Sequence, residues 1–291
     1  MLGIIDLPFY IIIFIFGCVI GSFLNVVIDR LPSGHSIVYP PSHCPHCRHR
    51  LAIWDLIPLF SFFYLRGRCR YCNKKISLYY PLIEVATGAL FVITTFIGIH
   101  QPVGSFIYFP EFIYLIYLLF IVSSLIIIFF IDLKYGIIPF KIIMASLAVI
   151  TIWYLFVNFE CVMSNGIASS FLLAMTSDCE APILNYFLSG MGVFAGFLLL
   201  FLFTRGRGIG FGDVVFGFFM GYVLGFPKIV LGVYISFLTG AFISLILIMA
   251  RKKKFKGGVI PFGPFLVSGT VISLFWGEII INKFLLYFHV I

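Results

Sequence analysis

Four cysteines occur as two CxxC pairs in one segment of the chain. Cys44 and Cys47 stand in CPHC, and Cys69 and Cys72 in CRYC, with twenty-one residues between the pairs. Two thiolates on each tight turn supply the tetrahedral sulfur ligands that suit Zn²⁺, and the intervening length fits paired-knuckle zinc sites. The alternative is a pair of redox motifs, but no thioredoxin-like strand and helix pattern surrounds them. We therefore predict a zinc site, and a structural one, because four cysteines leave no open coordination position.

Two aspartates each stand at one end of a long apolar run. Asp132 lies in IDLKYGIIP (131–139) and Asp213 in GIGFGD (208–213). Acids at such a depth are costly and point to function. Two carboxylates in one partly dry site cannot both ionise cheaply, so one can act as base on a water while its protonated partner polarises a carbonyl. This pattern favours aspartic protease chemistry. The alternative is that Asp213 caps its helix and Asp132 pairs with Lys134.

The glycines before Asp213 fit the same interpretation. Gly210 and Gly212 carry no side chain, so the backbone there can approach a substrate chain closely. The repeated GxGxGxG differs from the dinucleotide fingerprint GxGxxG, and no βαβ pattern surrounds it. We therefore expect these glycines to serve a protein substrate.

The composition identifies the elements that must position these residues. Apolar residues make up 62% of the 291 and charged residues 10%, with a mean hydropathy of +1.15, whereas soluble domains are roughly one-quarter charged. The apolar runs reach the length of ~20 residues that crosses a bilayer, without the alternation of a membrane barrel. We predict an all-α polytopic membrane protein with about eight transmembrane helices and a cytoplasmic zinc-binding loop. The expected spans are 9–28, 81–99, 112–131, 138–157, 185–204, 212–226, 229–250 and 259–282.

The basic residues predict the orientation. Seventeen of the nineteen Lys and Arg fall in alternate gaps between the runs, and the segment 29–80 alone holds eight. The positive-inside rule then places 29–80 in the cytoplasm and both termini outside. Anionic lipid beside such loops accounts for the net charge of +8, so we expect no nucleic-acid partner. Cys161 and Cys179 lie in the external gap 158–184, where an oxidising compartment permits a disulfide but the sequence leaves the pairing open.

Blocks of residues along the whole chain resemble the type IV prepilin peptidases, membrane aspartic proteases that process prepilins and the related pseudopilins of type II secretion. The matching blocks are GSFLNVVIDRLP (21–32), HCPHC (43–47), DLIPLFSFFYLRGRCRYC (55–72), ISLYYPLIEVATG (76–88), IDLKYGIIP (131–139), GFGD (210–213) and IPFGPF (260–265). The resemblance implies that Asp132 and Asp213 are catalytic and that the four loop cysteines bind zinc.

The resemblance also implies an activity and a location. The family cleaves a basic leader at the cytoplasmic face, typically between Gly and Phe, and many members then methylate the new N-terminus with S-adenosylmethionine. The full cysteine loop makes this chain look like the bifunctional type, in the bacterial inner membrane, with prepilins or pseudopilins as partners. We accordingly expect an N-terminal region (residues 1–100) that is associated with methylation and a six-helix aspartic peptidase region (residues 101–291).

Glu84 has two interpretations. It follows Pro81 at the cytoplasmic entry of the second span, so it could be an interfacial acid with an Arg or Lys partner. It could instead orient the new amino terminus of the substrate or the ammonium of the methyl donor. Phe140 departs from the family, which often has Asp or Asn there, and the gap 158–184 is longer than usual.

Two other functions are compatible with parts of the pattern. Presenilin-like intramembrane proteases share GxGD but lack a zinc loop, so the cysteine pairs argue against them. A transporter or scaffold with a zinc docking loop would use the acids for protons or for structure, and it would keep its function after both aspartates were replaced.

Overall fold

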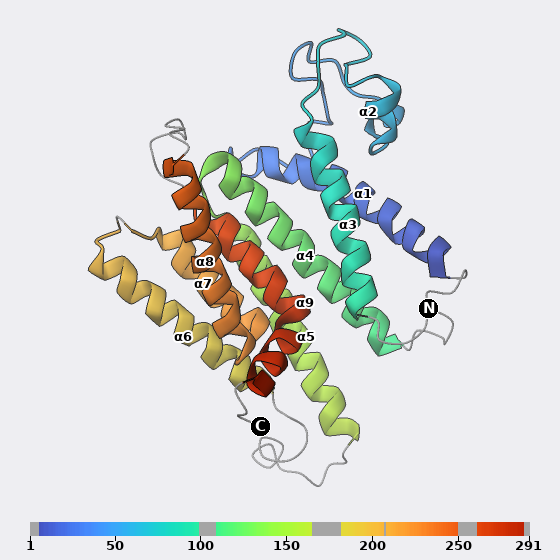
Figure 1. Cartoon of the computed structure of the whole chain (residues 1–291). Helices are drawn as coiled ribbons and strands as arrows, with labels where there is room; N and C mark the ends of the chain where they lie inside the picture. The colour runs from blue at the N-terminus through green and yellow to red at the C-terminus, as the bar shows by residue number, and fades with distance from the viewer. Residues whose placement is uncertain (1–5, 99–108, 165–181, 207, 250–260, 288–291) are drawn as a thin grey trace. The chain divides into compact units, whose positions relative to one another are not determined.

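The computed structural model describes residues 6–98, 109–164, 182–206, 208–249 and 261–287, and these are almost entirely helical (Figure 1). The helices in chain order are α1 (Asp6–Arg30), the 3₁₀ helix η1 (Ile53–Leu56), α2 (Phe60–Tyr64), α3 (Tyr79–Gly98), α4 (Phe109–Tyr135), α5 (Phe140–Ser164), α6 (Pro182–Phe203), α7 (Phe211–Leu224), α8 (Lys228–Met249) and α9 (Gly263–Tyr287). Within the described residues, β-pairing is limited to two isolated bridges, His43 with Arg50 and Arg68 with Lys75. The predicted all-α fold class is confirmed.

Seven of these helices are long and apolar enough to cross a membrane, namely α1, α3, α4, α5, α6, α8 and α9. The expected span 212–226 corresponds to α7, which has only 14 residues and so extends about 21 Å, less than the ~30 Å of the hydrocarbon core. Ten of its residues are buried, which shows that other helices surround it. It ends at Gly225, whose φ of 64° breaks the helix. The chain is a multi-pass membrane protein.

The chain divides into two compact units, 1–127 and 128–291, and the division falls within α4. In the first unit, α1 and α3 cross at a glycine pair. A Cβ added to Gly17 would lie 2.7 Å from Cα of Gly88, and one added to Gly21 would lie 2.8 Å from Cα of Glu84. Glycines four residues apart on one helix face allow such close backbone contact between membrane helices. This crossing fixes Glu84 against α1.

The second unit is built around α7 in a similar way. Gly217 and Gly221 are again four residues apart, and a Cβ on Gly221 would lie 2.6 Å from Cα of Gly190 on α6. Helices α8 and α9 pack against one another, and α7 also contacts α5, α8 and α9. Side chains such as Phe216, Phe219 and Met220 are fully buried at its centre. The helix that begins with the GxGD motif is therefore the core of its unit.

Candidate functional site: a cysteine cluster and two buried aspartates

The four loop cysteines converge as predicted. The Sγ atoms of Cys44, Cys47, Cys69 and Cys72 all lie within 4.8 Å of one another, and Cys44 Sγ is 3.9 Å from Cys72 Sγ. Four sulfurs at 2.3 Å from a tetrahedral Zn²⁺ stand about 3.8 Å apart. The donor set and its spacing therefore fit zinc.

The two cysteine turns repeat one backbone pattern at an interval of 25 residues. In the first, Cys44 N–H donates to His49 O at 3.0 Å and Leu51 N–H donates to Ser42 O at 2.9 Å. In the second, the equivalent bonds run from Cys69 to Lys74 at 2.9 Å and from Ile76 to Gly67 at 2.8 Å. The residue after each second cysteine is in the left-handed region, with φ of 57° at Arg48 and 56° at Asn73. Two matching turns thus present two thiols each to one centre.

The electrostatics of the cluster favour a divalent cation. Burial of the Cys44 thiol opposes its ionisation, but hydrogen bonds with the backbone of Cys47 and His46 outweigh it and lower the pKa of Cys44 to about 6. A backbone hydrogen bond at Lys74 favours the Cys72 thiolate, yet burial and the adjacent thiols raise the pKa of Cys72 to about 11. Hydrogen bonds among the four sulfurs thus favour the thiolate at Cys44 and the thiol at Cys72. A bound cation would favour the thiolate at every position.

The two aspartates both belong to the second unit, and both are buried, with 5% of Asp132 and 9% of Asp213 exposed. Asp132 lies in the last turn of α4, and Asp213 lies in the first turn of α7. The two carboxyl groups are close enough for Asp213 to act electrostatically on Asp132. The structure therefore brings together two acids that stand eighty-one positions apart in the sequence.

Each aspartate accepts a hydrogen bond from the backbone of a glycine. Gly263 N–H donates to Asp132 Oδ2 at 2.9 Å, and Gly210 N–H donates to Asp213 Oδ2 at 3.0 Å. Gly263 is the first residue of α9, and Gly210 precedes the first turn of α7. Two helix N-termini, with their partial positive charge, thus hold one oxygen of each carboxyl group. Gly210 is the N-cap of α7, and Asp213, at the third position of the helix, accepts the hydrogen bond from it. Asp213 also acts electrostatically on Asp132.

Gly263 was not identified from the sequence as a functional residue. A Cβ at this position would lie 2.5 Å from Asp132 Oδ2, so a larger residue cannot keep this contact. The signal in the sequence is a glycine followed by Pro264 at a helix start, where proline is favoured. Gly212 also has a packing reason to be glycine, since a Cβ there would lie 3.0 Å from Cβ of Ile138. The approach of substrate to Gly210 and Gly212 stays a prediction.

Glu84 has uncharged partners, in contrast to the Arg or Lys that one interpretation expected. It is 8% exposed. Its Oε2 accepts a hydrogen bond from Leu59 N–H at 2.9 Å, and the Ser22 hydroxyl also binds the carboxyl group. Glu84 thus joins α3 to α1 and to the segment between α1 and α3 that bears the four cysteines, here called the cysteine-bearing segment (31–78). Cys179 lies outside the described residues, so the possible disulfide between Cys161 and Cys179 stays an open prediction.

Comparisons with known proteins agree with the geometry. Residues 15–97 match the model of the bacterial peptidase A24 N-terminal domain, and residues 119–245 match that of the type IV leader peptidase family. A protein of Aeromonas hydrophila is 30% identical over 95% of this chain and 94% of its own length. One from Bacillus subtilis (strain 168) is 29% identical over 94% and 97%, and one from Legionella pneumophila is 29% identical over 96% and 95%. All three are called prepilin leader peptidase/N-methyltransferase. No solved structure matches the chain.

Proposed function

This chain belongs to the type IV leader peptidase family, and from that premise we propose that it removes the basic leader of prepilins or pseudopilins and methylates the new N-terminus. Its relatives carry both activities in their names. The cleaved bond is of the Gly–Phe type and lies at the cytoplasmic face of the bacterial inner membrane. The clustering of basic residues beside the aspartate-bearing helix ends supports this orientation.

The observation that carries the peptidase proposal is the buried pair Asp132 and Asp213. The ionised member takes a proton from water, and the water oxygen attacks the scissile carbonyl while the protonated member donates to the carbonyl oxygen. The C–N bond then breaks, and the leaving amine takes up a proton. Hydrogen bonds from Gly263 and Gly210 fix one oxygen of each carboxyl group, so the remaining oxygen of each has a defined direction.

Methylation requires a donor, and S-adenosylmethionine supplies an activated methyl group. The neutral N-terminal amine attacks the methyl carbon, a C–N bond forms, and the C–S bond breaks with its electron pair left on sulfur. The ammonium product loses one proton. We assign this activity to the N-terminal region, residues 1–100, and the peptidase to residues 101–291. Zinc at the four cysteines would hold the loop in shape, because a site with four sulfur ligands leaves no position for substrate.

Replacement of the aspartates tests the peptidase proposal. Asp132→Asn and Asp213→Asn should each abolish leader cleavage of a prepilin with a Gly–Phe junction, measured by mass spectrometry, because each acid works through its partner. Glu278→Gln is the matched control, since Glu278 is an acid of α9 whose carboxyl group pairs with Lys228 at 2.6 Å. Cleavage above a few per cent in either aspartate variant would remove that residue from the mechanism.

A further inference from the structure

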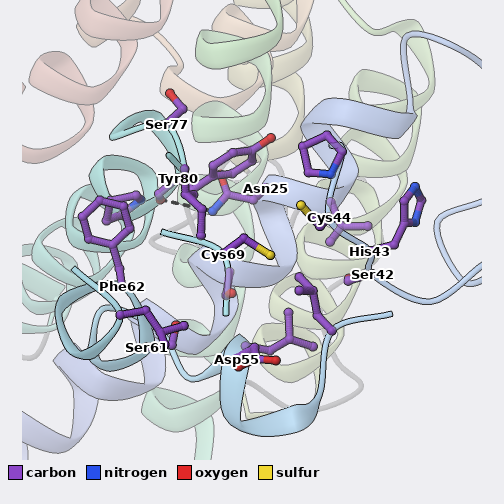
Figure 2. A pocket seen from close by; sticks show the side chains of 18 of the residues that line it. Asn25, Ser42, His43, Cys44, Asp55, Ser61, Phe62, Cys69, Ser77 and Tyr80 are labelled. Carbon is purple, nitrogen blue, oxygen red and sulfur yellow. Dashed lines mark hydrogen bonds between the residues drawn. The ribbon is translucent and has the colours of Figure 1, made fainter. Parts of the chain in front are cut away.

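The first unit contains a cavity of about 530 Å³ that the peptidase mechanism does not use. Its lining comes from α1, from the cysteine-bearing segment and from the start of α3, and Figure 2 shows Asn25, Tyr80, Cys44 and Cys69 around it. This volume lies in the usual range of small-molecule sites, ~300–1,000 Å³. The cavity thus has the size of a cofactor site.

Asn25 is the polar group that points to a ligand. It is 6% exposed and lines the cavity. Its Nδ2 donates to the backbone oxygen of Tyr80 at 3.2 Å, and since a carbonyl can only accept, the amide orientation is fixed. Oδ1 is then the one buried side-chain oxygen or nitrogen, among the described residues, without a hydrogen-bond partner from the protein. Buried polar atoms in native proteins nearly always have a hydrogen-bond partner. The unpaired Asn25 Oδ1 therefore points to a ligand that donates a hydrogen bond to it.

The wall around Asn25 is rich in acceptors. Ser22, Asn25 and Asp29 follow one face of α1 at helical spacing, and Glu84 of α3 lines the same cavity. The Tyr80 hydroxyl donates to Asp29 Oδ2 at 3.1 Å, which holds that carboxylate at the wall. Two carboxylates and an amide oxygen together favour a cationic group with N–H donors.

Basic residues also line the cavity. Two of them are held by groups of the protein, and two others are exposed. Arg70 pairs with Asp55 at 2.7 Å, and Arg30 donates to the backbone oxygen of Ser36 at 3.1 Å. Lys74 and Lys75 are exposed and line the cavity as well, so they could pair with an anionic group of a ligand. Apolar side chains, among them Leu51, Phe62 and Ile76, line the rest.

We propose that this cavity binds S-adenosylmethionine, with its ammonium group donating to Asn25 Oδ1. This assignment rests on the proposed methyltransferase activity. The ammonium and the sulfonium both carry positive charge and match the wall of Asn25, Asp29 and Glu84. The carboxylate of the donor matches Lys74 and Lys75, and the adenine ring matches the apolar lining. The proposed binding requires no contact between the donor and Asp132 or Asp213.

The first experiment measures binding of tritiated S-adenosylmethionine to the purified full-length protein. Asn25→Leu keeps the approximate side-chain volume and removes the acceptor, so its Kd should rise about ten- to a hundredfold, as expected for a lost hydrogen bond to a charged group. Phe23→Leu is the control, because Phe23 lies on the exposed face of the same helix and should not change the Kd. Zinc content and leader cleavage, measured on the same preparations, report whether each variant folds. An unchanged Kd for Asn25→Leu would overturn the assignment.

A second measurement does not depend on the folding of a variant. Ultraviolet irradiation of the wild-type protein with the tritiated donor should label a peptide within residues 22–84, and label confined to 128–291 would contradict the proposal. Lys74→Gln with Lys75→Gln should raise the KM for the donor and leave the KM for a cleaved pilin peptide unchanged. If Asn25→Leu instead raises only the KM for the peptide, the cavity holds the pilin terminus and the donor assignment is wrong. If the wild-type protein neither binds the donor nor methylates a cleaved peptide, the methyltransferase function itself fails.

Discussion

The carboxyl group of Asp132 accepts a hydrogen bond from the backbone N–H of Gly263, 131 residues further along the chain. This bond joins the last turn of α4 to the first residue of α9. Together with the bond from Gly210 to Asp213, it gives both members of the proposed dyad the same kind of support. The paired acids therefore depend on two helix starts as well as on each other.

A substitution at Gly263 should impair leader cleavage. In Gly263→Ala the new Cβ would lie 2.5 Å from Asp132 Oδ2. The Asp132 carboxyl group must then move away from residue 263 and lose its present position. Misplacement by about 1 Å can cost a hundredfold in rate, and we expect a loss of that order in kcat. The measurement is leader cleavage by the purified protein under saturating substrate.

Gly196→Ala is the matched control for Gly263→Ala. Gly196 lies in α6, and an added Cβ there meets nothing within 4 Å. This variant should cleave the leader at the rate of the wild type. Equal rates for both variants would show that the contact between Gly263 and Asp132 does not position the acid.

Sequence reasoning found the aspartates and the cysteines because their types and spacing carry chemical information. CxxC pairs predict a tetrahedral thiolate site by themselves, and an acid beside an apolar run is costly enough to indicate a function. At Gly263 the sequence indicates only a helix start, a glycine followed by Pro264, and it does not show the contact with Asp132, because the fold alone brings that carboxyl group near. The sequence likewise does not show the role of Asn25. Its Nδ2 donates to the backbone oxygen of Tyr80, which the fold brings near, and its Oδ1 is left without a partner.

Two other features could not be predicted from the sequence, because they depend on backbone conformation and on helix packing. The run 212–226 is apolar enough for a span, but Gly225 ends the helix early, and hydropathy does not register a backbone conformation. Glu84 was expected to find a basic partner, or to serve the substrate or donor. Its partners are a backbone N–H and a hydroxyl, because the glycine crossing of α1 and α3 places it inside the unit.

The zinc site should be structural. Purified protein should contain about one zinc per chain, and Cys→Ser at 44, 47, 69 or 72 should release it and increase proteolysis of the loop. Because the loop lines the proposed donor cavity, these variants should lose methylation more steeply than cleavage. Cys18→Ser is the control, since Cys18 is buried in α1 outside the cluster. Elemental analysis without zinc in a loop that still resists protease would refute the structural role.

The glycine crossing of the first unit should be sensitive to size. In Gly21→Leu the Cβ would lie 2.8 Å from Cα of Glu84, so α1 and α3 must separate and the position of Glu84 must change. We expect a lower Tm and a weaker affinity for S-adenosylmethionine. Val19→Leu enlarges a side chain that is 50% exposed on the same helix and should change neither. A Gly21→Leu protein with wild-type Tm and affinity would show that the close crossing is dispensable.

The last prediction separates the two activities. Leader cleavage needs the pair Asp132 and Asp213, whereas methyl transfer needs a neutral amine aligned with the methyl group of the donor, which is a problem of position. Asp213→Asn should therefore fail to methylate an intact prepilin, because no amine is released. The same variant should methylate a pilin peptide supplied already cleaved, at a rate close to that of the wild type.

The measurement is transfer of a tritiated methyl group to each peptide, followed by mass spectrometry of the terminus. An amide in place of the Asp213 carboxyl group leaves every residue of the first unit unchanged, including the cysteines and Asn25. The substitution should therefore have little effect on the rate of methyl transfer to the cleaved peptide. If wild-type protein methylates the cleaved peptide and Asp213→Asn does not, methyl transfer requires the aspartate pair directly, and a donor site confined to the first unit cannot account for the second activity.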